Sequence, residues 1–140
     1  MVEMPNEVIE LFNDLESIKV LVTIDENNVS HCVPAGSLCV LSLSMIAFAV
    51  IMMKKSHNNL LYCCENGKTV VAMVVKGLKS YQVKALAKEY LTEGITYEKF
   101  RDGLKPLLSN SNFELKGVWI LQPTEIYNQS MGWNAGEKIA

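Results

Sequence analysis

Residues 29–53 form a long stretch without any Asp, Glu, Lys or Arg, and two lysines follow it directly. Such a stretch belongs either in a protein core or in a membrane, because it is long enough to span a lipid bilayer. Pro34 and Gly36 interrupt it, and its Val, Ile, Cys and Phe residues gather in two short blocks, which is typical of strands. We therefore predict a buried β-hairpin with strands over residues 38–41 and 45–51.

A membrane-spanning segment is the alternative for this stretch. The predicted turn at residues 42–44, Ser-Leu-Ser, lacks the Asn-Gly or Asp-Gly pair that marks a tight hairpin turn, so the turn itself does not decide the question. The first five residues, MVEMP, contain neither a basic segment nor an apolar one, so no secretory signal is predicted. We expect a cytoplasmic protein that has no membrane partner.

The segment that follows the stretch, residues 54–59, has the sequence KKSHNN and concentrates groups that bind phosphate. Ammonium groups supply positive charge, and hydroxyl and amide groups supply directed hydrogen bonds to phosphate oxygens. At the end of a predicted strand, this combination indicates a phosphorylated ligand. An ordinary solvated strand end is the alternative that the residues alone leave open.

Composition limits the classes of protein that fit. The 140 residues are 49% hydrophobic, which is enough for one domain with its own core, so residues 1–140 are predicted to form a single domain. The formal net charge is −2, whereas a general nucleic-acid binder would need a clustered basic face, so no nucleic-acid partner is expected. The four cysteines lack metal-ligand spacing and have apolar neighbours, which predicts reduced, buried thiols and no metal site.

The remaining periodicities predict helices among many strands. Apolar residues at helical spacing indicate an amphipathic lid helix over residues 5–15. Five or six strands with mostly hairpin connections indicate a small antiparallel barrel, because closure removes exposed sheet edges. The other predicted strands span residues 18–24, 29–33, 68–75, 81–90 and 117–122, and the other predicted helices span residues 58–64 and 96–107, the last ended by Pro106.

This order of elements resembles the pyridoxamine 5'-phosphate oxidase-like FMN-binding split barrels, in particular the short single-domain FMN-binding proteins. The resemblance covers nearly the whole chain, and its strongest part is residues 31–37, HCVPAGS, followed after one hairpin by Lys55, Ser56 and Asn59. It implies a mainly β protein with two or more short helices, folded as an antiparallel split β-barrel that binds FMN.

In relatives, a Lys/Arg-Ser/Thr pair with a nearby Asn binds the FMN phosphate. The resemblance therefore assigns Lys55 and Ser56 to the phosphate, with Lys54 adding charge. Asn59 would add a hydrogen bond.

The resemblance also implies how the flavin would lie. Residues 34–37 would run beside the ribityl chain and ring, where Gly36 lets the backbone approach closely. Residues 48–50, on the next strand, would lie along the isoalloxazine. The cofactor-binding residues that the resemblance implies are Pro34, Ala35, Gly36, Ser37, Phe48, Ala49, Val50, Lys54, Lys55, Ser56, Asn59 and Trp133.

In this family two subunits pair and the flavin lies at their interface, so the resemblance implies a homodimer. The apolar strand at residues 70–75 is compatible with this, because one small barrel does not easily hide it. Trp133 would reach the flavin of the partner, since an aromatic ring with a polar N–H suits the lip of such a site. The alternative for Trp133 is an ordinary surface aromatic.

The expected function is that of an FMN-dependent oxidoreductase that passes electrons from a donor through FMN to a small acceptor. True pyridoxamine phosphate oxidase activity is not expected, because the arginine and histidine set that grips its substrate is not found. His31 and His57 accompany no nucleophile motif, so no catalytic residue is assigned. A non-catalytic flavin-binding or redox-carrier protein is one alternative, and a sibling barrel that binds haem or a deazaflavin is another.

Overall fold

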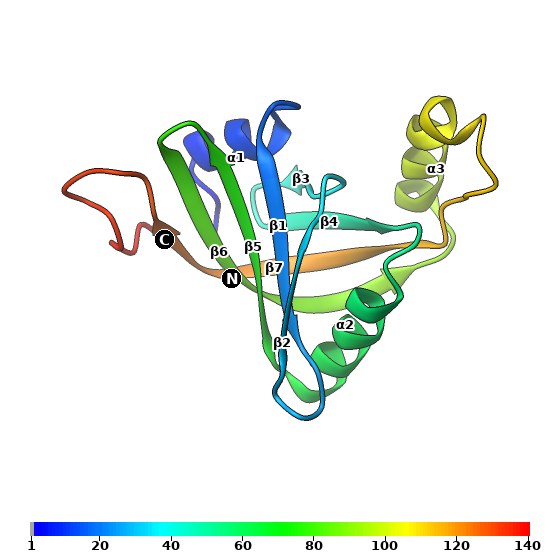
Figure 1. The fold of residues 1–140 in the computed structure, drawn as a ribbon, viewed down its shortest axis with the longest axis horizontal. Helices are drawn as coiled ribbons and strands as arrows, with labels where there is room; N and C mark the ends of the chain where they lie inside the picture. The colour runs from blue at the N-terminus through cyan, green and yellow to red at the C-terminus, as the bar shows by residue number, and fades with distance from the viewer. Residues whose placement is uncertain (1) are drawn as a thin grey trace.

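The computed structural model describes residues 2–140. Within them, the strands form one sheet in the order β2-β1-β5-β6-β7-β4-β3, and every neighbouring pair is antiparallel (Figure 1). The outer strands β2 and β3 do not pair with each other, so the barrel is open and the predicted split-barrel fold is confirmed. The strands are β1 (Ile18–Ile24), β2 (Ser30–Pro34), β3 (Cys39–Ser42), β4 (Met45–Val50), β5 (Thr69–Lys76), β6 (Lys79–Leu91) and β7 (Gly117–Asn128), and the helices are α1 (Asn6–Asn13), α2 (Lys54–Asn66) and α3 (Ile95–Leu108).

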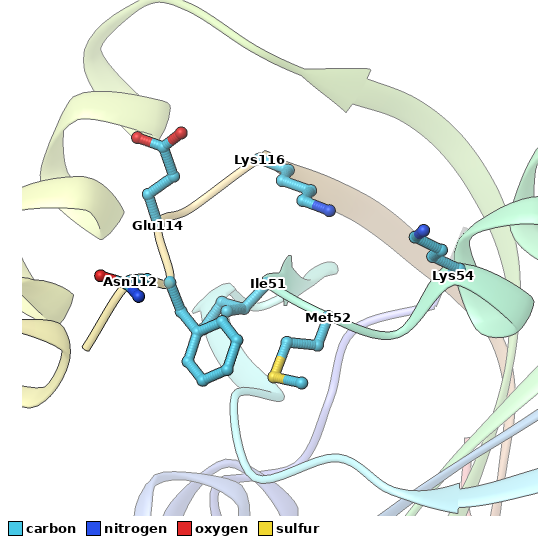
Figure 2. Close-up of a pocket in the computed structure, with 7 residues that line it drawn as sticks. Ile51, Met52, Lys54, Asn112, Glu114 and Lys116 are labelled. Carbon is cyan, nitrogen blue, oxygen red and sulfur yellow. The ribbon is translucent and has the colours of Figure 1, made fainter.

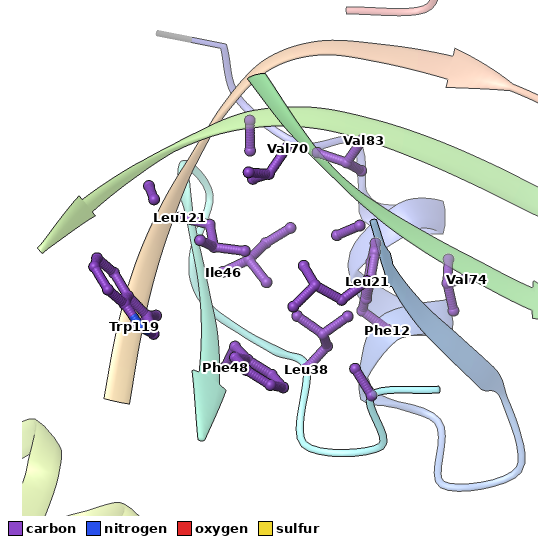
Figure 3. Packing of buried hydrophobic residues seen from close by; sticks show 14 of the residues in the cluster. Phe12, Leu21, Leu38, Ile46, Phe48, Val70, Val74, Val83, Trp119 and Leu121 are labelled. Carbon is purple, nitrogen blue, oxygen red and sulfur yellow. The ribbon is translucent and has the colours of Figure 1, made fainter. Parts of the chain in front are cut away.

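The core lies between the inner face of the sheet and helix α1. Alternate residues of β1 and β5 are buried, as expected for strands with one face inside. Figure 3 shows Phe12 of α1 converging on Leu21 of β1 and Val74 of β5. The predicted amphipathic helix is therefore confirmed, although it begins after Pro5 and ends before Leu15, whose side chain is 97% exposed.

The uncharged stretch folds as the predicted hairpin. Cys39 of β3 pairs with Ala47 of β4, and β4 in turn pairs with β7 on its other side. Strand β4 is thus internal to the sheet, and all of its residues after Met45 are buried. Among the described residues, no helix has the length and apolar character needed to cross a bilayer.

Helix α2 begins at Lys54, so the helix predicted over residues 58–64 is present but starts four residues earlier than predicted. The buried face of the helix contains Ser56, Asn59, Leu60 and Cys63, which follow helical spacing. Because the first two of these side chains are polar, the apolar pattern that marks an amphipathic helix begins only halfway along it. The phosphate-type residues therefore lie on the first turns of a helix. Gly67, in the left-handed region with φ 63°, ends the helix.

Two elements extend past prolines, beyond their predicted ends. Strand β7 continues past Gln122 through Pro123 to Asn128, because its pairing with β4 ends at Leu121 and its register against β6 shifts beside Pro123. Helix α3 likewise continues past Pro106 to Leu108, because a proline in the last turn removes only one intrahelical hydrogen bond. Helix α3 projects where β6 ends and β7 begins (Figure 1).

The thiols differ in their surroundings. Cys63 is buried and Cys39 and Cys64 are half-buried, but Cys32 is exposed on β2, so the prediction of buried thiols is wrong there. Within residues 2–140, no group of three or more His, Cys, Asp or Glu side chains could hold a metal ion.

Candidate functional site

An open apolar cavity of about 340 Å³ lies between the loop after β2 and the end of β4. Met52 and Met53 of the following loop line it, and Leu108 and Phe113 close it from the side of α3. Because Met53 also precedes the first residue of α2, the cavity reaches the N-terminus of that helix. The predicted site residues that line it are Ala35, Gly36, Ser37, Phe48 and Ala49.

A hydrogen-bonded clamp holds the two walls of the apolar cavity together. The Ser37 hydroxyl donates to the Ala49 carbonyl across 3.2 Å and accepts from the Ala49 N–H across 3.1 Å. The Ala35 N–H also donates to the Lys19 carbonyl at 2.8 Å, which fixes the loop to β1. The Ser37 hydroxyl is therefore used within the protein, and it positions the wall rather than offering a free hydroxyl to a ligand.

Gly36 leaves open space in this wall. A Cβ placed on Gly36 would meet no other atom within 4 Å. The protein itself therefore does not require glycine here for packing. The absence of a side chain instead keeps room beside the backbone, where a ligand can approach closely.

The N-terminus of α2 offers unused hydrogen-bond donors beside positive charge. The Ser56 side chain is only 1% exposed, and its hydroxyl has no hydrogen-bond partner within residues 2–140. The N–H groups of Lys55 and Ser56 likewise find no acceptor in the described part of the chain, and no side chain caps the helix. The first turn carries lysines and no acidic residue at the positive end of the helix dipole. These groups suit an anion.

Lys55 is not free in this structure. Its ammonium nitrogen lies 3.4 Å from a carboxylate oxygen of Asp25, which belongs to the turn between β1 and β2. The Val29 N–H is the main cause that lowers the pKa of Asp25, with smaller contributions from the Asn27 N–H and from Lys55. The lysine side chain is 56% exposed, so it can turn toward a ligand at modest cost.

The Asn59 amide already has a hydrogen-bond partner within the chain. The side chain is 2% exposed, and its amide nitrogen donates to the Thr23 hydroxyl across 3.0 Å. The side chain thus fastens α2 to β1. Of the predicted phosphate residues, the structure brings Lys54, Lys55 and Ser56 together on the first turn and places Asn59 in the buried helix contact.

Two further predicted residues lie away from the apolar cavity. Pro34 is exposed at the end of β2, where it pairs with Val20 of β1. Trp133 is fully exposed in the segment after β7, which Figure 1 shows at the opposite end of the molecule from α2 and α3. Within one chain, Trp133 is therefore not part of the site, and its contact with a partner's flavin stays a prediction.

A cluster of three rings behind the N-terminus of α2 was not predicted. The Trp119 indole Nε1–H donates to Nδ1 of His57 across 2.9 Å. The Tyr90 ring lies against both, with ring centroids 4.5 Å from His57 and 5.2 Å from Trp119. Burial lowers the pKa of His57, and nearby Lys116 lowers it further. Because Trp119 and His57 lie far apart in the sequence, no local pattern could have indicated their contact.

A second cavity of about 170 Å³ adjoins this cluster, and Val50 and Lys54 of the predicted set line it. A third, of about 310 Å³, lies between Lys54 and the segment that precedes β7. Figure 2 shows the residues of this third cavity, with the Lys54 and Lys116 ammonium groups pointing toward one another.

No protein-family model matches the sequence, and no curated protein matches it either. Solved structures do match. HupZ of Group A Streptococcus has a TM-score of 0.74 at 21% identity, covering 95% of this chain and 99% of that one. An FMN-binding protein of Syntrophomonas wolfei has a TM-score of 0.65 at 21% identity, covering 90% of this chain and 88% of that one.

A third solved structure is a Clostridium acetobutylicum protein related to general stress protein 26, of the pyridoxinephosphate oxidase family. It has a TM-score of 0.65 at 14% identity, covering 95% of this chain and 92% of that one. These likenesses define the fold: the chain has the split-barrel fold found in pyridoxamine 5'-phosphate oxidase-like and FMN-binding proteins. The predicted resemblance is therefore confirmed at the level of the fold.

Proposed function

We propose that this protein is a cytoplasmic flavoprotein that binds FMN and passes electrons from a donor to a small acceptor. The observation that carries the proposal is the unpartnered, buried Ser56 hydroxyl on the first turn of α2, the helix whose preceding residue, Met53, lines the apolar cavity. A buried hydroxyl without a partner is unfavourable, so its presence beside free N–H groups and two lysines favours an anionic ligand. FMN joins a phosphate to a flat, largely apolar ring, which suits this pairing.

The residues present fit each part of FMN. The phosphate would accept hydrogen bonds from the Lys55 and Ser56 N–H groups and from the Ser56 hydroxyl, with Lys54 and Lys55 supplying charge. The ring would lie in the apolar cavity against the backbone of Gly36 and the end of β4, which the Ser37 clamp holds in place. Bound FMN would supply the redox chemistry, and the protein would supply its orientation and surroundings.

A homodimer with the flavin at the subunit interface is part of the proposal. The pairing register places an apolar row on the outer face of β1 and β5, and its side chains are only half-buried within one chain, which leaves a surface that a second copy would cover. Trp133 would then contact the flavin of the partner subunit. The inner members of the row are Val20, Val22, Val71 and Met73.

The absorption spectrum of the purified protein, followed by titration with FMN, haem and a deazaflavin, tests the proposal. A flavin spectrum, or saturable binding of FMN in preference to the other two, is expected. Preference for haem or for the deazaflavin would instead assign the protein to a sibling type of split barrel. Turnover with a reduced nicotinamide and a panel of small acceptors then separates an oxidoreductase from a flavin carrier without a substrate of its own.

A further inference from the structure

The second and third cavities share lining residues and so adjoin one another. Met52, Lys54 and Lys116 line both of them, and we call their union the two-lysine groove. The groove also adjoins the apolar cavity, because Met52 and Phe113 line the groove and that cavity alike. A molecule in the groove would therefore lie next to whatever fills the apolar cavity.

The groove carries positive charge that no acidic side chain neutralises. Neither Lys54 nor Lys116 forms an ion pair within residues 2–140, whereas Lys55 is paired with Asp25. Figure 2 shows the two ammonium groups turned toward one another across the groove, while the Glu114 carboxylate points away from them. Two facing cations repel each other, and an anion placed between them removes that repulsion.

The inner end of the groove adds hydrogen-bond donors. Nδ1 of His57 accepts the Trp119 indole N–H, so the neutral imidazole carries its proton on Nε2, which is then a hydrogen-bond donor without a partner in the described residues. Asn58 and Tyr90, whose side chains also carry hydrogen-bond donors, line the second cavity together with His57. The rings of Trp119 and Tyr90 fix the imidazole in place, so the donor is held before any ligand arrives.

We propose that the two-lysine groove binds the carboxylate or phosphate group of a small molecule other than the cofactor. The groove lies beside the apolar cavity, so an anion held between Lys54 and Lys116 would direct the rest of its molecule toward that cavity. The anion site stands on its own geometry. The role of the site rests on the proposed function. In that function, the molecule bound in the groove is the electron donor or acceptor, and it is a small anion.

The Trp119 indole N–H signal in a nitrogen-15 NMR spectrum is the direct probe, because its acceptor, His57, lines the groove. Trp133→Phe identifies the signal by removing the other indole. Inorganic phosphate and malonate are each titrated at constant ionic strength, with and without saturating FMN. Phosphate and malonate together show whether the groove prefers phosphate or carboxylate groups.

We expect a saturable shift of this signal in the protein and in Lys99→Ala, an exposed lysine of α3 that serves as the matched control. Lys116→Ala and Lys116→Gln should each lower the affinity for the anion at least tenfold, and the second variant keeps the test valid if the first folds poorly. Equal affinity in the Lys116 variants and the control would overturn the proposal. Loss of the response when FMN is bound would also overturn it, because the groove would then be the phosphate pocket of the cofactor. If FMN does not bind but the Lys116 dependence holds, the anion site stands and the proposed function fails.

Discussion

The Trp119 indole N–H donates a hydrogen bond to Nδ1 of His57 across 2.9 Å and so ties β7 to the first turn of α2. Tyr90 of β6 lies against both rings. The position of the α2 N-terminus, and with it the candidate phosphate site, therefore depends on a contact between residues far apart in the sequence.

Trp119→Phe tests this contact. The change leaves Nδ1 of His57 without its donor and removes part of a side chain that is 1% exposed, so we expect a loss of about 2–4 kcal/mol in the free energy of unfolding. Urea unfolding measures it. The matched control is Trp133→Phe, which alters an exposed ring and should change stability by no more than about 0.5 kcal/mol. Similar stability in both variants would contradict the role of the contact.

The protein should become less stable as the pH falls through the titration range of His57. Burial and then Lys116 lower its pKa in the folded protein, so the unfolded chain binds the proton more readily. The contribution of neutral His57 is fully present above about pH 6.5 and is lost as the pH falls toward the lower, folded-state pKa. Protonation would also place a hydrogen on Nδ1 of His57, so this atom could no longer accept the hydrogen bond from the Trp119 N–H. Lys54 and Tyr90, which line the same cavity, add no negative charge that would favour the imidazolium.

Melting temperatures between pH 7.5 and 5 measure this effect. The protein should lose more stability over that range than His57→Gln, which cannot take up the proton. Parallel curves for the two proteins would show that His57 does not control the pH dependence.

Asp25→Asn should strengthen FMN binding. The carboxylate holds Lys55 and would repel a phosphate, whereas the amide oxygen can still accept the N–H groups of Asn27 and Val29. Since an exposed ion pair contributes little, the gain should be at most about fivefold. Fluorescence titration with FMN and riboflavin checks it, and riboflavin should not respond. Weaker FMN binding would mean that Asp25 positions Lys55 for the ligand.

Gly117→Ala should disturb the ring cluster. A Cβ at this position would overlap the Tyr90 ring, so the ring must shift from its place in the cluster, at a cost of about 1–3 kcal/mol in stability. Denaturant unfolding measures the cost. Tyr90→Ala in the same chain removes the clash, so adding the Gly117 change to that variant should cost much less. An equal cost in both backgrounds would show that the ring is not what excludes a side chain here.

Gly36→Ala separates ligand space from protein packing. Because a Cβ there meets nothing within 4 Å, stability should stay within about 0.5 kcal/mol. The methyl group would contact the flavin ring rather than the phosphate, so the affinities for FMN and riboflavin should fall by similar factors. Unchanged affinity for both would place the flavin elsewhere.

The sequence predicts the sheet better than it predicts the helices. The hairpin of β3 and β4 follows from two short apolar blocks that are typical of strands, and the predicted strand over residues 18–24 matches the bounds of β1. Helix α2 was predicted to begin at residue 58 instead of Lys54, because Ser56 and Asn59 occupy its buried face and hide the apolar period. The strand predicted over residues 117–122 ended directly before Pro123. Strand β7 continues through this proline because its pairing with β4 ends at Leu121, and where that pairing ends depends on the tertiary structure.

The candidate site, like the fold, was predicted only in part from the sequence. The meeting of residues 35–37 with Phe48 and Ala49 was expected from the resemblance to a family, not from their spacing, and the apolar cavity brings them together. Lys54, Lys55 and Ser56 were found from their local chemistry. Lys116 could not be found, because its approach to Lys54 depends on the pairing of β7 with β4.

The comparison of FMN with riboflavin in Lys55→Ala/Ser56→Ala tests the central claim most directly, because the two ligands differ only in the phosphate. Each lost charge-assisted hydrogen bond should cost about 1.5–3 kcal/mol, so FMN should weaken more than tenfold while riboflavin changes by less than about twofold. Lys99→Ala, with its lysine on α3, should leave both affinities unchanged. Equal weakening of the two flavins in the double variant, or no FMN binding by the folded protein, would contradict a phosphate site at the N-terminus of α2.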